Sequence, residues 1–228
     1  MNPLTIALPK GRLFDAALDL CAAVGFEVSE ARNTRKLIVE DPAQGVRVLL
    51  LKPVDVLTFV EYGAADLGIV GQDILREREE EVFEPLALPF GYCRLVLAGK
   101  PERAQTDWRL APSLRIATKY PQLTRKFFSE RGWSAEIITL NGSVEIGPAL
   151  GLSDLLVDLV DTGRTLRENG LVEFEELFKS QATLIVNRSS HTLRFDEINR
   201  LQRAIQAHYQ TGELYATPTY RSTHPHFF

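Results

Sequence analysis

The sequence predicts an α/β protein built from two lobes. Short apolar runs alternate along the 228 residues with segments whose apolar residues recur at helical spacing. The same Gly-x-x-Asp turn joins a predicted helix to an apolar strand twice, at 63–66 and at 151–154. Two lobes of similar design would produce this repetition. Ordinary turn chemistry, in which glycine ends a helix and aspartate opens a strand, is the alternative.

The first part of the chain is predicted to hold four strands and two helices. Gly25 follows the first helix, and Pro53 suits the first turn of the second. A charged stretch at 76–81 separates the third strand from the fourth, and 100–112 is predicted to be a loop. The predicted strands are 4–8, 46–51, 67–70 and 92–98, and the helices are 13–24 and 53–62.

The second part continues the α/β alternation. Its predicted strands are 114–118, 135–140, 154–160 and 182–186, and its helices are 122–130, 144–150 and 195–209. We expect residues 1–90 and 181–210 to form lobe I and residues 91–180 to form lobe II. Residues 211–228 are predicted to be a flexible tail.

The composition excludes several classes of protein. Cys21 and Cys93 lie inside apolar runs, which indicates reduced thiols and not a disulfide scaffold. The start of the chain lacks the pattern of a signal peptide, and no apolar run approaches the roughly 20 residues of a membrane span. A formal net charge of -4 gives no basic field for nucleic acid. We therefore expect a cytoplasmic protein with no membrane and no nucleic acid as partner.

The segment from Asp158 to Leu166 carries the clearest chemical signal. A buried strand runs into the polar turn Asp161-Thr162-Gly163-Arg164-Thr165 and then into a short helical segment. Free N–H groups at a helix start, a glycine and two hydroxyl groups suit a phosphate monoester. The aspartates could accept hydrogen bonds from ribose hydroxyls and support positive charge on a sugar ring. In isolation, the same residues could merely cap the helix.

The context of this loop resembles the ATP phosphoribosyltransferase family, which catalyses the first step of histidine biosynthesis. The segment 145–151 (E-I-G-P-A-L-G) followed by 158–166 is similar to that family's signature. Further similar segments follow in the same order over most of the chain: 8–13 (L-P-K-G-R-L), 35–37 (R-K-L), 61–73 (E-Y-G-A-A-D-L-G-I-V-G-Q-D), 116–120 (I-A-T-K-Y) and 140–145 (L-N-G-S-V-E). The length resembles the short form of the family.

The resemblance implies a two-lobed fold similar to type II periplasmic binding proteins, with the active site in the cleft between the lobes. It implies a pentosyltransferase in which adenine N1 of ATP attacks the anomeric carbon of phosphoribosyl pyrophosphate (PRPP), giving N1-(5-phosphoribosyl)-ATP and pyrophosphate. It also implies a regulatory subunit resembling histidyl-tRNA synthetase, with a dimer of catalytic chains inside a hetero-oligomer. Mg²⁺ is expected to arrive largely on PRPP, so no protein residue is assigned as a metal ligand.

The residues expected to bind PRPP surround the phosphate turn. Strand alternation would send the side chains of Asp158 and Asp161 to opposite faces unless the strand ends between them, so Asp158 has a structural alternative. Asp161 and Arg164 depart from the smaller residues of many family members, which leaves the role of Arg164 open. The predicted PRPP-binding residues are Glu145, Asp158, Asp161, Thr162, Gly163, Arg164, Thr165 and Leu166.

A second group of residues is expected to face the pyrophosphate. Lys10 and Arg12 directly follow the first strand, where α/β sheets bind ligands, and the resemblance places Arg35 with them. These three are the predicted catalytic residues, because their charges can stabilise the departing oxygens. Solvated surface charge is the alternative for any one of them alone. The predicted ATP-binding residues are Lys10, Gly11, Gly71 and Asp73.

Two other functions fit parts of the sequence. Residues 63–71 also resemble the ligand-cleft segment of periplasmic solute receptors, so a non-catalytic binding module is one alternative, against which the missing signal peptide counts. A nucleobase-salvage phosphoribosyltransferase is the other, since its phosphate loop also has acids before a Thr-Gly turn. The sequence has no GxGxxG or GxxxxGK[ST] loop, and its four histidines all lie after residue 190.

Overall fold

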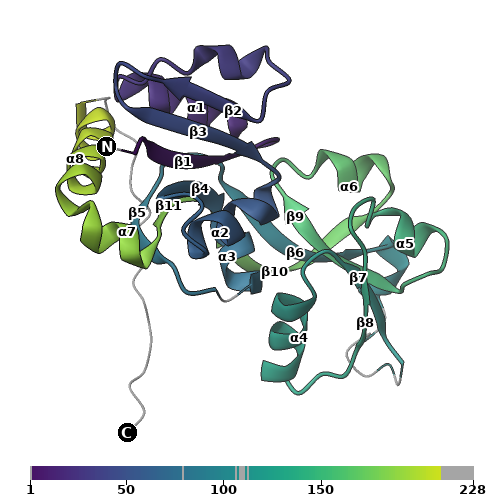
Figure 1. Ribbon diagram of the computed structural model, residues 1–228. Helices are drawn as coiled ribbons and strands as arrows, with labels where there is room; N and C mark the ends of the chain where they lie inside the picture. The colour runs from purple at the N-terminus through teal and green to yellow at the C-terminus, as the bar shows by residue number, and fades with distance from the viewer. Residues whose placement is uncertain (1, 79, 106, 108–110, 112, 212–228) are drawn as a thin grey trace, which may run out of the picture.

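The chain folds around two separate β-sheets (Figure 1). The computed structural model describes residues 2–78, 80–105, 107, 111 and 113–211, so all of the predicted tail except residue 211 lies outside the described part. One sheet has six strands in the order β2-β3-β1-β4-β11-β5, and the other has five in the order β10-β6-β9-β7-β8. The fold is therefore α/β, as predicted.

The six-stranded sheet and the helices around it form lobe I. Its strands are β1 (Leu4–Pro9), β2 (Ile38–Asp41), β3 (Val46–Leu51), β4 (Leu67–Gly71), β5 (Phe83–Ala87) and β11 (Ala182–Val186). Its helices are α1 (Phe14–Ala23), η1 (Ser29–Arg32), α2 (Pro53–Glu61), α3 (Gln72–Arg78), α7 (Arg188–Leu193) and α8 (Phe195–Thr211).

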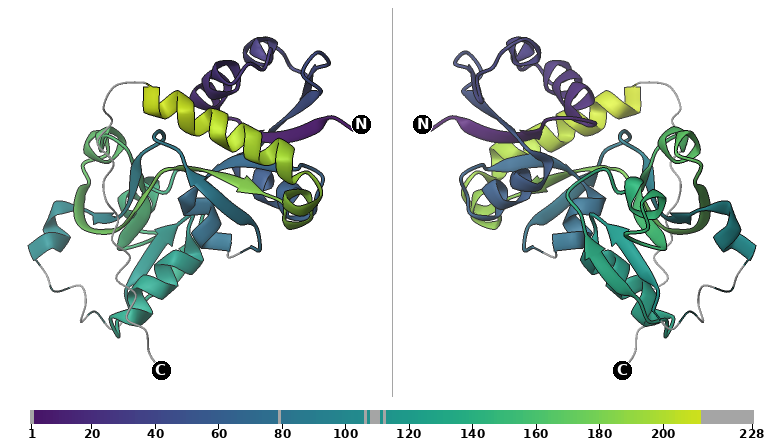
Figure 2. Two further views of the ribbon diagram at one scale, coloured as in Figure 1. Left: turned by 90° about the vertical axis from the view of Figure 1, so that its left-hand side faces the viewer. Right: turned by 90° about the vertical axis from the view of Figure 1, so that its right-hand side faces the viewer.

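Helices cover both faces of the lobe I sheet because its central strands are apolar on both sides. One core joins the sheet to α1 and α8, and the other joins it to α2 and α3. Figure 2 shows α8 lying across lobe I on the side of α1. Leu8 belongs to the first core and its neighbour Ala7 to the second, which is the alternation that a strand buried on both faces requires.

The five-stranded sheet and its helices form lobe II. Its strands are β6 (Cys93–Gly99), β7 (Arg115–Thr118), β8 (Glu136–Thr139), β9 (Leu155–Val160) and β10 (Val172–Ser180). Its helices are η2 (Pro101–Gln105), α4 (Pro121–Glu130), α5 (Ile146–Ala149) and α6 (Arg164–Glu168). Aromatic residues of α4 pack on one face of the sheet, and Val144 and Leu166 pack on the other.

The repeated Gly-x-x-Asp turn has the same geometry in both lobes. Gly63 and Gly151 have φ angles of 72° and 73°, in the left-handed region that glycine favours. Asp66 accepts a hydrogen bond from the Thr5 N–H at 2.8 Å and donates its own N–H to the Thr5 carbonyl. Asp154 makes the same pair of bonds with Arg115. The matching contacts support two lobes of similar design.

Two chain segments connect the sheets. One lies between β5, which ends at Ala87, and β6, which begins at Cys93; the other is the single residue between β10 and β11. The two segments lie side by side: the Gln181 side-chain amide donates to the Leu88 carbonyl at 3.4 Å, and Ala182, the first residue of β11, exchanges backbone hydrogen bonds with Leu88 and Phe90. We propose these paired segments, called the crossover below, as the border between the lobes. The boundaries expected at 90/91 and 180/181 stay a prediction, which this position of the crossover supports.

Several elements differ from the sequence predictions. The structure adds strands β2, β5 and β10 and helices η1, α3 and α7, none of which the apolar pattern predicts. The charged stretch at 76–81 begins inside α3, and the segment predicted to be a loop at 100–112 contains η2. Each predicted strand and helix is present, with shifts of a few residues at the ends.

Candidate active site between the two sheets

The candidate site lies where the carboxyl ends of parallel strands meet across the lobes. Strands β3, β1 and β4 are parallel in lobe I, and β8, β7 and β9 are parallel in lobe II. Ligands of α/β proteins bind at such ends. Asp73, just after β4, accepts a hydrogen bond at 3.1 Å from the hydroxyl of Tyr120, just after β7. The carboxyl edges of the two sheets therefore face each other.

The lobe I edge is basic. Lys10 follows β1 and Lys52 follows β3, and both side chains are exposed. Arg35 lies in the segment that leads into β2, whose first residue pairs with Leu49 near the end of β3, so it belongs to the same edge. Arg12 is fixed more firmly, because its Nη1 donates to the Gly91 carbonyl at 2.5 Å. The structure thus brings the three predicted catalytic residues to one edge.

The residues predicted to bind ATP divide into two pairs. Lys10 and Gly11 are exposed, and Gly11 has a φ of 102° that only glycine adopts readily. Gly71 and Asp73 are buried. A Cβ added at Gly71 would lie 2.2 Å from Oδ1 of Asp73, so the missing side chain makes room for that carboxylate. Contact with ATP stays a prediction, and burial favours another role for the second pair.

The lobe II edge contains the predicted phosphate turn. Strand β9 ends at Val160, and α6 begins at Arg164 after Gly163, whose φ is 72°. Thr162 and Thr165 are exposed, while Leu166 is buried in the core and anchors the short helix. The first N–H groups of a helix have no acceptor within that helix. The turn therefore presents N–H donors and two hydroxyl groups to the space beside the sheet.

Arg164 and Arg167 make contacts within the turn region. Arg164 donates from Nε to Glu168 Oε1 at 2.7 Å, one helical turn along, and its side chain is exposed. Arg167 donates from Nη1 to the Thr162 carbonyl at 3.0 Å. The structure therefore pairs Arg164 along its own helix, and Arg167 holds the backbone of the turn in place.

The predicted acids lie around this turn in different environments. Asp161 comes after the end of β9 and is exposed, so strand alternation does not separate it from the site. Asp158 shares a sheet face with Leu156 and Val160, which pack towards α5 and α6. The pKa of Asp158 is raised to about 6, chiefly by burial and also by the neighbouring charge of Glu145, while the Leu159 N–H and Lys119 act to lower it. Asp158 and Glu145 therefore form one electrostatic cluster.

The β8–α5 loop carries Glu145 as its last residue. It connects Thr139 to Ile146, and Ser143 within it is the non-glycine residue with a positive φ, 51°, among the described residues. Such backbone strain is found at functional sites and persists only where surrounding contacts enforce it. The Ser143 carbonyl accepts the Ile146 N–H, which fixes the entry into α5 and so the position of Glu145.

Some residues at these edges were missed by the sequence predictions. Lys52 and Lys119 directly follow parallel strands and Tyr120 comes one residue later, so the strand-end rule that selected Lys10 could have selected them too. Burial, and next the charge of Asp73, raises the pKa of Tyr120, which keeps its hydroxyl group protonated as a donor. Burial also raises the pKa of Cys93, whose thiol lies within electrostatic range of Arg12 and Asp161.

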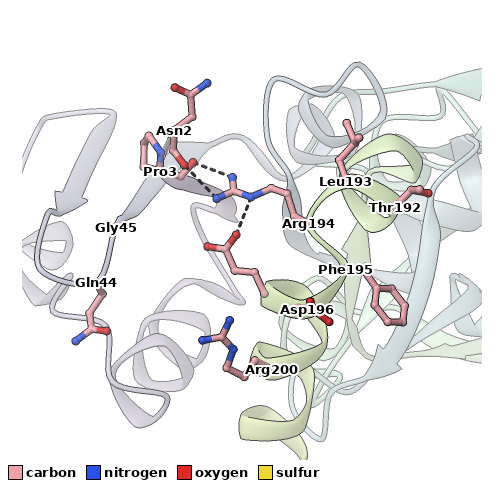
Figure 3. A pocket seen from close by; sticks show the side chains of 11 residues that line it. Asn2, Pro3, Gln44, Gly45, Thr192, Leu193, Arg194, Phe195, Asp196 and Arg200 are labelled. Atoms are coloured by element: carbon pink, nitrogen blue, oxygen red, sulfur yellow. Dashed lines mark hydrogen bonds and ion pairs between the residues drawn. The ribbon is translucent and has the colours of Figure 1, made fainter.

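Among the described residues, no group of three or more His, Cys, Asp or Glu side chains is placed to hold a metal ion. No helix in the described part is long and apolar enough to cross a membrane. A cavity of about 550 Å³, shown in Figure 3, lies at the opposite, amino edge of the lobe I sheet beside Gly45 and Arg194. It is remote from the strand-end loops.

Comparisons with known proteins agree on one family. Residues 52–207 match the family model for ATP phosphoribosyltransferase (HisG). The ATP phosphoribosyltransferase of Moorella thermoacetica is 48% identical over 95% of this chain and 98% of its own length. That of Geobacter metallireducens is 46% identical over 90% of this chain and 98% of its own.

One solved structure supports the same family, and a second shares the fold. The ATP phosphoribosyl transferase (HisG:HisZ) complex from Thermotoga maritima is similar, with a TM-score of 0.79 and 33% identity over 91% of this chain and 98% of that one. The ancestral amino acid-binding protein AncCDT-1 has a TM-score of 0.57 at 14% identity, covering 92% of this chain and 91% of its own. At that identity the second likeness shows a shared fold alone.

Proposed function

The chain belongs to the ATP phosphoribosyltransferase family, and we propose that its reaction takes place between the carboxyl edges of the two sheets. The reaction joins ATP and PRPP to give N1-(5-phosphoribosyl)-ATP and pyrophosphate, the first step of histidine biosynthesis. The hydrogen bond from Tyr120 to Asp73 carries the proposal, because it brings a basic edge opposite an edge of acids and hydroxyl groups. PRPP has matching chemistry, with a pyrophosphate at one end and a ribose phosphate at the other.

The phosphate turn is proposed to bind the 5′-phosphate of PRPP. The N–H groups at the start of α6 and the hydroxyl groups of Thr162 and Thr165 would donate to its oxygens. Gly163 permits a close approach because it has no side chain. Leu166 would contribute by anchoring α6, and Arg164, which pairs with Glu168, would act at the rim of the turn.

Glu145, Asp158 and Asp161 are proposed to surround the ribose. The N1 lone pair of adenine forms the new N–C bond while the bond between the anomeric carbon and pyrophosphate breaks, and the leaving group takes the bonding electrons. The ring gains positive charge as this happens, which nearby carboxylates stabilise. Asp158 offers that charge only above its raised pKa, so its electrostatic contribution is expected to increase as the pH rises through about 6.

Lys10, Arg12 and Arg35 are proposed to bind the departing pyrophosphate, and Lys52 extends the same basic edge. Charge on the leaving oxygens increases toward the transition state, so these contacts strengthen as the bond breaks. Mg²⁺ would enter as part of the substrate, held largely by PRPP oxygens. We therefore expect Arg12→Ala to lower kcat more than it raises KM; a rise in KM alone would remove Arg12 from this role.

The proposed partner is a regulatory subunit resembling histidyl-tRNA synthetase, in keeping with the HisG:HisZ complex of the similar structure. The catalytic chain would form a dimer within that hetero-oligomer, in the cytoplasm. The test is a pyrophosphate-release assay with this chain, ATP and PRPP, with and without such a subunit. Release that depends on both substrates is expected. Release with hypoxanthine or guanine, and none with ATP, would support a salvage enzyme instead.

A further inference from the structure

Asp73 lies between the two lobes, and both of its carboxylate oxygens accept hydrogen bonds. Its side chain is 4% exposed. Oδ1 accepts a hydrogen bond from the Ser180 hydroxyl at 2.8 Å, and Oδ2 accepts one from the Tyr120 hydroxyl at 3.1 Å. The Ser180 oxygen in turn accepts the Asp73 N–H at 3.0 Å. A buried carboxylate requires such donors, because an unpaired charge away from water is costly.

The contacts of Asp73 come from three parts of the molecule. Tyr120 belongs to lobe II, Ser180 is the last residue before the crossover, and Arg12 belongs to lobe I. Nη2 of Arg12 lies 3.9 Å from Oδ1 of Asp73, while its Nη1 donates to the Gly91 carbonyl in the crossover segment between β5 and β6. The Gly91 carbonyl thus fixes one nitrogen of the guanidinium group, while the Arg12 side chain remains 36% exposed.

We propose that Asp73 is a positioning residue, which couples the placement of lobe II, through Tyr120, to the orientation of the Arg12 guanidinium group. The inference rests on the proposed role of Arg12 toward the leaving pyrophosphate. The proposal assigns Asp73 a role other than contact with ATP. When the Tyr120 hydroxyl bonds to Oδ2, the carboxylate is fixed between the lobes and Oδ1 faces Arg12. Without that bond only the Ser180 hydroxyl holds the carboxylate, so the counter-charge of the guanidinium group is less firmly fixed.

A second contact between the lobes provides a matched control. Glu77, one helical turn after Asp73 in α3, accepts the N–H groups of Gln122 and Leu123 at 2.9 and 3.0 Å. These are the free donors at the start of α4, so a carboxylate from lobe I caps a helix of lobe II. Loss of Glu77 weakens the contact between the lobes and leaves the bonds of Asp73 in place.

The experiment is a double-mutant cycle on turnover. The variants Tyr120→Phe, Arg12→Ala, Glu77→Ala and the two doubles that combine Arg12→Ala with each of the others are assayed for kcat and for the KM of PRPP. The assay uses either the chain alone or the chain with its regulatory subunit, whichever releases pyrophosphate faster. Tyr209→Phe, which removes a hydroxyl group from a half-buried ring in α8, is the control for loss of a tyrosine hydroxyl. Thermal unfolding of each variant confirms a folded chain.

We expect Tyr120→Phe to lower kcat about tenfold with little change in KM, and Tyr209→Phe to leave kcat unchanged. The Tyr120→Phe/Arg12→Ala double should have a kcat within about twofold of Arg12→Ala alone, because the bond acts through Arg12. The double with Glu77→Ala should instead show the product of the single effects.

Two results would overturn the positioning role and leave the proposed function standing. One is a kcat of the Tyr120→Phe/Arg12→Ala double that shows the product of the two single losses. The other is a wild-type kcat for Tyr120→Phe. A wild-type kcat for Arg12→Ala would overturn both, because the proposed function would lose its leaving-group residue. The two failures are therefore distinguishable.

Discussion

Replacing Asp158 with asparagine should remove a pH-dependent loss of stability. Asparagine keeps the size of the side chain and an oxygen that can accept the Leu159 N–H, a bond of 2.8 Å in the structure. The pKa of Asp158 is raised from 3.8 to about 6, mainly by burial. The folded chain therefore holds this proton more tightly than the unfolded chain does.

The size and sign of the effect follow from the linkage between ionisation of Asp158 and folding. Ionisation of Asp158 costs nothing below pH 3.8, costs more as the pH rises through 6, and reaches its full cost above that value. With those two values, the cost is about 1.6 kcal/mol at pH 5 and about 3 kcal/mol at pH 8. Relative to the wild type, Asp158→Asn should thus gain about 1.4 kcal/mol of unfolding free energy between pH 5 and pH 8.

The assay is urea unfolding of both proteins at the two pH values, at constant ionic strength. Comparing the variant with the wild type cancels the titration of all other groups. Val157→Ala is the control, because Val157 is fully buried in the same strand and carries no proton; it should destabilise the chain equally at both pH values. If Asp158→Asn and the wild type show parallel pH dependence, within about 0.3 kcal/mol, then burial does not raise this pKa and the reasoning fails.

Three further predictions concern the phosphate turn and the surroundings of Asp73. Thr165→Ala should weaken PRPP binding about tenfold while unfolding stays cooperative, since one donor to phosphate is lost; unchanged affinity in calorimetry would remove Thr165 from the site. Gly163→Ala should cost about 1–2 kcal/mol in urea unfolding and raise the KM for PRPP, because a left-handed residue gains a Cβ 2.9 Å from Arg167 Nη1; wild-type values for both would contradict the proposed geometry. Gly71→Ala should cost about 2–4 kcal/mol, because its Cβ would overlap Asp73 Oδ1; a stable, fully active variant would show that Asp73 can move freely.

The sequence predicts the central elements well because their signals are local. The strands at 46–51 and 182–186 have the predicted bounds, since each is a short apolar run buried in the sheet. Helix α2 begins at Pro53 as predicted, because proline sets the backbone angle of a first helical turn and has no N–H to leave unpaired.

The missed elements lack such a signal. Strand β10 forms the edge of the lobe II sheet, carries Glu173, Glu175 and Glu176, and has two shifts in register against β6, so its alternation is broken. Strand β2 has four residues and also lies at an edge, where exposed side chains dilute the apolar pattern. Edge strands are stabilised by pairing with a neighbouring strand, and the local sequence pattern does not show that pairing.

The candidate site likewise contains residues that a local sequence signal predicts and contacts that no local signal indicates. The phosphate turn and Lys10 could be selected because each follows one strand directly along the chain. The bond from Tyr120 to Asp73 joins residues 47 positions apart in different lobes, so no local pattern indicates it. Asp73 is therefore predicted as a ligand contact by resemblance, whereas its burial and bonds favour a positioning role.

The central claim is that the turn from Asp161 to Thr165 binds the 5′-phosphate of PRPP while the basic edge of lobe I binds its pyrophosphate. The most direct measurement is a crystal structure of the chain soaked with PRPP and Mg²⁺. The account predicts phosphate oxygens within hydrogen-bond distance of Thr162 and Thr165, with the pyrophosphate beside Arg12. An empty turn, with the sugar phosphate bound elsewhere on the molecule, would contradict it.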